Sequence, residues 1–231
     1  EMAPWRPVLV VENLLRTGRQ AEARALLATD WPETPDEFEA FYQSSVLTEL
    51  NDGFAALDAL ARKPAVTDGE VLLTARLAAL ASAQKERLLS QEVERALAPR
   101  LTPATLPVIK VLTAHLIRHP DRDIFQRVLA KVERERVPFT DQTAAIWFSL
   151  FCAAGAVGDE AALGRLTGSI REATGQPFLV LGATEAFFRG DSNERSILPF
   201  LPALLLPLEV TYALLERYIP TRQTARPGRA P

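Results

Sequence analysis

The chain has 231 residues, of which 48% are hydrophobic and 24% are charged, and its formal net charge is −3. This is the composition of a soluble globular protein with enough apolar surface for one large core or two small ones. A net charge this close to zero gives no field that would attract nucleic acid or anionic lipid, so we expect no nucleic acid as a partner. The single cysteine, Cys152, excludes an internal disulfide and a cysteine-based zinc site.

No stretch of the sequence is a candidate for a membrane-spanning helix, which needs about 20 consecutive apolar residues. The longest uncharged run, 142–158, falls short of this, and the apolar run 197–208 is interrupted by three prolines. The run 8–11 is too short for the core of a secretory signal. We therefore expect a soluble protein, and a single cysteine fits the reducing cytoplasm.

Apolar residues recur three and four positions apart along most of the chain, which predicts amphipathic helices. In chain order, the predicted helices are 8–15, 21–28, 38–50, 55–62, 70–81, 85–98, 108–117, 123–136, 144–154, 161–173 and a final helix over 207–218. The segment 176–183 is the one candidate for a strand. Short connections between the helices favour antiparallel pairs. The sequence therefore predicts an all-α fold of about five to six helical hairpins.

Several helix starts are marked by their residues. Thr34 and Thr67 are each followed three residues later by a glutamate, which matches a capping box. Thr102 before Pro103 and Thr140 before Asp141 predict similar starts.

The segment Gly18-Arg-Gln-Ala-Glu-Ala23 resembles the turn and second helix of a tetratricopeptide repeat (TPR). That family has a small residue at the turn, an alanine five positions later and a proline further on, and this chain has Gly18, Ala23 and Pro35 there. Ala56 follows Ala23 by 33 residues (56 − 23), close to the family's period of about 34. The resemblance implies a TPR-like solenoid that binds a peptide or partner protein on a concave surface.

Over residues 2–60 the chain resembles the TPR family in its sequence motif. From there to about residue 174 the resemblance is only in the succession of helical hairpins. The first helix departs from the family pattern by carrying Pro7 and Val11 at its usual aromatic and glycine positions. We divide the chain into a TPR-like array (2–175), C-terminal capping helices (176–219) and a basic tail or linker rich in proline and arginine (220–231).

Family geometry places five residues of the first helices on the concave surface: Trp5, Glu12, Arg16, Phe41 and Ser45. Exposed aromatic rings beside an arginine suit peptide binding. The alternative is that Trp5 and Phe41 pack the cores of their hairpins.

Three other residues are candidates for chemistry. His115 and His119 are four apart and could share a metal ion, but His119 precedes a proline, which disfavours helical geometry there. Cys152 has apolar neighbours and no adjacent base, as a packed core cysteine would. We therefore expect helix-end histidines, no metal, no cofactor and no catalytic residue in this segment.

The end of the chain is basic. Arg217, Arg222, Arg226 and Arg229 follow Glu216 without another acid, and basic residues of this kind flank the cytoplasmic side of membrane spans. In layout alone, this resembles the soluble region ahead of the membrane part of some bacterial rhomboid-like intramembrane proteases, and none of the protease's motif residues is present. A disordered tail is the other interpretation.

Our leading hypothesis is a non-enzymatic cytoplasmic scaffold that binds a protein or peptide. The alternative is a regulatory domain on the cytoplasmic face of a larger membrane protein whose catalytic part lies beyond residue 231. An unrecognised enzyme with a site between helices is a third hypothesis, which the lack of clustered catalytic groups disfavours.

Overall fold

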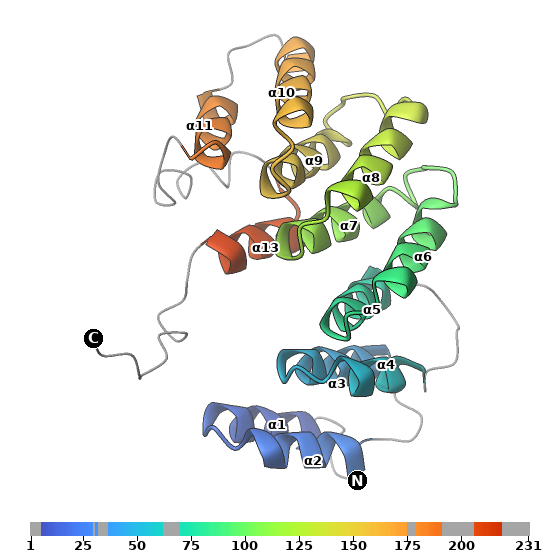
Figure 1. Cartoon of the computed structure of the whole chain (residues 1–231), viewed down its shortest axis with the longest axis vertical. Helices are drawn as coiled ribbons and strands as arrows, with labels where there is room; N and C mark the ends of the chain where they lie inside the picture. The colour runs from blue at the N-terminus through green and yellow to red at the C-terminus, as the bar shows by residue number, and fades with distance from the viewer. Residues whose placement is uncertain are drawn as a thin grey trace, which may run out of the picture. The chain divides into compact units, whose positions relative to one another are not determined.

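The computed structural model describes residues 6–29, 31, 37–61, 70–174, 179–190 and 206–218. Within these ranges the chain forms α-helices and no strand (Figure 1), which confirms the all-α prediction. The helices are α1 (Arg6–Arg16), α2 (Gln20–Thr29), α3 (Glu37–Glu49), α4 (Gly53–Ala61), α5 (Glu70–Ser82), α6 (Glu86–Leu97), α7 (Pro107–Arg118), α8 (Arg122–Arg134), α9 (Ala144–Ala156), α10 (Glu160–Thr174), α11 (Leu179–Phe188) and α13 (Leu208–Tyr218).

Two sequence predictions of local structure were wrong. The candidate strand 176–183 is helical from Leu179 onward, as part of α11. The helices α7 and α9 begin at Pro107 and Ala144, several residues after Thr102 and Thr140. The reason is local: the Thr140 N–H donates to the Thr143 hydroxyl at 2.9 Å, which closes a turn ahead of the helix. The capping boxes that begin at Thr34 and Thr67 start outside the described residues.

The chain divides into two compact units, 1–92 and 93–231. In the first unit, α1 packs on α2, α3 packs on α4, and α5 packs on both α3 and α4 (Figure 1). Its core joins Val11 and Leu14 of α1 to Leu27 of α2 and to residues of the following helices. Ala23 and Ala56 are fully buried in this core, where their small side chains let neighbouring helices approach closely.

The hairpins α1–α2, α3–α4 and α5–α6 turn through the same backbone motif. Gly18, Asn51 and Gln84 have φ angles of 76°, 57° and 54°. Each lies just after the C-terminus of the first helix of its hairpin, and the three positions are 33 residues apart in the sequence. In each turn, the next N–H bonds to the carbonyl five residues back at 2.8–3.0 Å. This is a Schellman motif, which ends a helix and satisfies its last carbonyls. The 33-residue spacing noted for Ala23 and Ala56 is therefore present in the backbone as well.

The second unit is built around α7 and α9. The helix α7 packs against α8, α9 and α13, and α9 also packs against α10 and α11. Nearly every side chain of α9 is buried, as expected for a helix that is apolar on all sides. The helix α13 lies along α7 although it is about 100 residues later in the chain. The arrangement of all the hairpins as one continuous solenoid stays a prediction.

Candidate peptide-binding face

The first helices α1 and α3 are joined by a hydrogen bond on the predicted binding face. The Tyr42 hydroxyl on α3 donates to the Glu12 carboxylate on α1 at 2.7 Å. Burial raises the pKa of Tyr42, and the neighbouring Glu12 carboxylate raises it further. The tyrosine therefore stays protonated and keeps its donor directed at Glu12, which links the two helices at this position.

The residues of this face occupy equivalent positions in successive repeats. Because the turns recur every 33 residues, Glu12 corresponds to Ser45, and Arg16 corresponds to Glu49. Glu12, Arg16 and Glu49 are exposed, and Ser45 is half-buried. Arg16 in the last turn of α1 thus has a residue of opposite charge, Glu49, at the equivalent position in α3. We call the set Glu12, Arg16, Phe41, Tyr42, Ser45 and Glu49 the first-helix face.

The two predicted aromatic residues of the face differ in what the structure describes. Phe41 is half-buried and packs against the core cluster of the first unit, so part of its ring serves the core and part reaches the surface. Trp5 lies outside the described residues. Arg16 donates from Nη2 to the Asn13 side chain on its own helix at 3.3 Å, a contact that leaves most of the guanidinium donors available.

Sequence reasoning missed Tyr42 and Glu49. The signal for Glu49 was present, because adding the 33-residue period to Arg16 gives this position. Tyr42 carried no comparable signal: its role depends on α1 and α3 lying together, and the sequence does not show which side of α3 faces α1.

His115 and Cys152 are buried, whereas His119 is exposed. His115 is 6% exposed, and its ring lies 5.0 Å from that of His119 between ring centroids. Burial, reinforced by His119 and Arg118, lowers the pKa of His115 to about 3. His115 lies in the last turn of α7, and His119 is the residue at its C-cap. Cys152 is fully buried, and burial raises the pKa of its thiol. No group of three or more metal-ligating side chains occurs among the described residues.

Arg217 belongs to α13, and its guanidinium donates hydrogen bonds to the C-terminal ends of two other helices. It donates to the carbonyl oxygen of Ile117 at 2.6 Å and to that of Ala156 at 3.0 Å. Both carbonyls lie in last turns, where helices leave acceptors unsatisfied and carry partial negative charge. The other three arginines of the predicted basic segment, Arg222, Arg226 and Arg229, lie outside the described residues, and the membrane-protein alternative that depends on them stays a prediction.

None of the helices in the described part of the chain is long and apolar enough to cross a membrane. No family model, no curated protein and no solved structure matches the chain.

Proposed function

We propose that the first-helix face binds a peptide segment of a partner protein and that the chain works as a non-enzymatic scaffold. The observation that carries the proposal is the Tyr42–Glu12 hydrogen bond at 2.7 Å. This bond links the first helices of two successive repeats, and the same two helices carry Arg16 and Glu49 in their last turns. A surface made by side chains from successive repeats is the usual binding surface of helical repeat proteins.

The chemistry of the face favours a peptide with mixed charge. Arg16 offers a planar set of donors that suits a carboxylate, and Glu49, one repeat further on, suits a lysine or arginine. The exposed part of Phe41, about two turns before Glu49 on α3, offers an apolar contact. Such a combination of an aromatic residue and an arginine is typical of residues that dominate binding energy in interfaces.

A peptide-library selection on the immobilised full chain tests the proposal. Peptides enriched on the chain are measured by fluorescence anisotropy against the chain and against Arg16→Glu. We expect Arg16→Glu to weaken binding roughly tenfold, the effect of about 1.4 kcal/mol, with an unchanged melting temperature because Arg16 is exposed.

The matched control is Arg87→Glu, which makes the same charge change at an exposed position on α6, a second helix of its hairpin. Its affinity for the selected peptides should equal that of the unaltered chain. Equal weakening by both variants would show a general effect of charge and would contradict the proposal. If the selected peptides bind Arg16→Glu as tightly as the unaltered chain, the binding surface lies elsewhere.

A further inference from the structure

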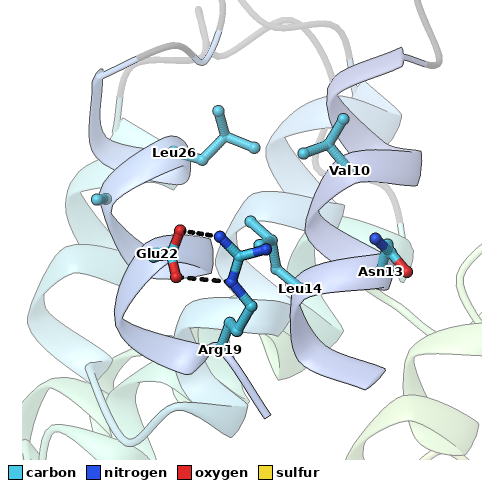
Figure 2. Close-up of a pocket in the computed structure, with 7 residues that line it drawn as sticks. Val10, Asn13, Leu14, Arg19, Glu22 and Leu26 are labelled. Carbon is cyan, nitrogen blue, oxygen red and sulfur yellow. Dashed lines mark hydrogen bonds and ion pairs between the residues drawn. The ribbon is translucent and has the colours of Figure 1, made fainter. Parts of the chain in front are cut away.

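The hairpin α1–α2 carries an open hollow on the side away from α3. The hollow has a volume of about 500 Å³ and is lined by Val10, Asn13, Leu14, Arg19, Glu22, Ala25 and Leu26. Figure 2 shows Val10 and Leu26 approaching each other from the two helices at one end, and Arg19 paired with Glu22 at the other. Val10 is 42% exposed, and the adjacent Leu9 is 67% exposed. Leu9 lies 100° from Val10 around α1 and does not line the hollow, so Val10 is the exposed large apolar side chain of this face.

The opposite side of the same hairpin is occupied by the next repeat. Glu12 accepts the hydrogen bond from Tyr42 of α3, and Arg24 of α2 pairs with Asp52 after α3. A helix turns by 100° per residue, so Glu12 and Arg24 lie on the faces opposite Val10 and Leu26. The hollow therefore lies on the side of α1–α2 that faces away from the next repeat.

The 33-residue period identifies that counterpart on the next hairpin, α3–α4. Val10 corresponds to Gln43, Leu14 to Leu47, and Leu26 to Ala59. These three equivalents are 1%, 4% and 0% exposed. Val10 is exposed and Leu26 is half-buried, so these two positions are more open on α1–α2 than on α3–α4, whereas Leu14 is buried like its equivalent.

The helix α2 bonds to this part of the next hairpin. Gln43 Nε2 donates to the Leu27 carbonyl oxygen at 2.6 Å, and Arg24 Nη2 donates to the Leu50 carbonyl oxygen at 2.7 Å. Arg24 Nε also lies 3.8 Å from the Asp52 carboxylate. The protein thus contains an example of a helix bonded to this type of face, through an arginine side chain and, three positions later, the carbonyl oxygen of the buried Leu27.

We propose that the hollow on α1–α2 binds an amphipathic helix of a partner protein, in the position that α2 takes on α3–α4. The period places Arg19 where the next hairpin has Asp52, so the charge of the receiving residue is reversed. The incoming helix therefore carries an aspartate or glutamate where α2 has Arg24, followed three residues later by a leucine-like side chain. Arg19 already holds Glu22, and a guanidinium has enough donors for a second carboxylate. This site is separate from the first-helix face and does not rest on its proposed function.

Two synthetic probes test the proposal on the full chain. One is the α2 sequence Gln20–Thr29 with Arg24→Glu, and the other is the same sequence with the native arginine; both are held helical by a side-chain staple, because an isolated helix of this length does not form in water. We expect the glutamate probe to bind on the order of fivefold more tightly by fluorescence anisotropy, since it exchanges a repulsive pair for an attractive one at a surface.

Variants of the chain give the proposal its sharpest test. Arg19→Glu should reverse the preference between the two probes, and Leu26→Glu should abolish saturable binding of both. The matched control is Leu208→Glu, which places the same charge at an exposed leucine of α13 and should leave binding unchanged. The circular dichroism spectrum and melting temperature of each variant establish that it is folded.

Three outcomes would overturn the proposal. The first is no saturable binding of the glutamate probe, and the second is the same preference for that probe in Arg19→Glu as in the unaltered chain. The third is self-association of the chain that Leu26→Glu removes, which would make the occupant a second copy. Arg16→Glu separates the two sites, since it should weaken the peptides selected on the first-helix face and leave the helical probes unaffected.

Discussion

The ring of Phe188 on α11 lies directly against Gly155 on α9, and a Cβ atom on residue 155 would overlap it. The same ring packs edge-on against Phe151 and Tyr218, with centroid distances of 6.2 and 6.0 Å. Three helices of the second unit, α9, α11 and α13, therefore meet at one aromatic cluster. The missing side chain at Gly155 is what allows Phe188 to enter it.

We expect Gly155→Ala to lower the free energy of unfolding by about 1–3 kcal/mol, because the added methyl group forces Phe188 out of its position. The control is Gly164→Ala on α10, where no atom would come within 4 Å of the new Cβ. That change should raise the free energy of unfolding by about 0.5–1 kcal/mol, because alanine favours a helix interior. Urea denaturation measures both, and destabilisation of equal size in the two variants would contradict the role given to Phe188.

The recurring turns make a second prediction about stability. Gln84 adopts a φ of 54° and Asn51 a φ of 57°, a conformation that costs most residues about 1–2 kcal/mol and glycine nothing. Gln84→Gly should therefore raise the free energy of unfolding by about 1 kcal/mol. Asn51→Gly should raise it less, since asparagine tolerates this conformation. Thermal melts that show Gln84→Gly to be destabilising would contradict the assigned backbone geometry.

Arg217→Met tests the link between α13 and the ends of α7 and α9. Methionine keeps much of the apolar stem of arginine and removes the donors to Ile117 and Ala156. We expect the free energy of unfolding to fall by about 1–2 kcal/mol, since two charge-assisted bonds to helix ends are lost at a partly exposed site. Arg165→Met, at an exposed position on α10, is the control in chemical denaturation. An equal decrease in the free energy of unfolding in Arg165→Met would contradict a specific role of Arg217.

His115 makes the stability of the protein depend on pH. The unfolded chain takes up a proton near the ordinary histidine pKa of about 6.5, whereas the folded chain keeps His115 neutral down to about pH 3. Acidification in this window therefore favours the unfolded state: the contribution is fully present above pH 6.5 and declines as the pH falls toward 3. Between pH 7 and 5 it should fall by about 2 kcal/mol, at 1.36 kcal/mol for each pH unit below 6.5.

The measurement for His115 is urea denaturation of the unaltered chain and of His115→Gln at both pH values. The glutamine variant has no proton to take up at this position, so its loss between pH 7 and 5 should be smaller by about the same amount. An equal loss in both proteins would show that His115 does not titrate differently in the folded and unfolded states.

The sequence predicts the helices of this protein well and their turns only in part. Gly18 identifies its turn because glycine favours positive φ, but Asn51 and Gln84 adopt the same conformation with side chains that occur in many other settings. Their turns become recognisable only through the 33-residue spacing from Gly18. Segment 176–183 was wrongly predicted as a strand, because a short apolar run fits a strand and a buried helix equally well.

Contacts between distant parts of the chain could not be predicted. Arg118 of α7 pairs with Glu216 of α13 at 2.5 Å, and no periodicity in either helix indicates the other. For the same reason Arg217 was predicted to be part of a basic membrane-proximal segment, although the structure uses its guanidinium on two helix ends. The neutral state of His115 likewise depends on burial that the tertiary packing creates.

The central claim is that the first-helix face binds a peptide, and nuclear magnetic resonance tests it most directly. A peptide selected on the chain is titrated into ¹⁵N-labelled protein, and the amide signals that shift are assigned. The account predicts that the largest shifts fall on Glu12, Arg16, Phe41, Ser45 and Glu49, with few shifts on α10. Largest shifts in the second unit, with the first-helix face unchanged, would contradict it.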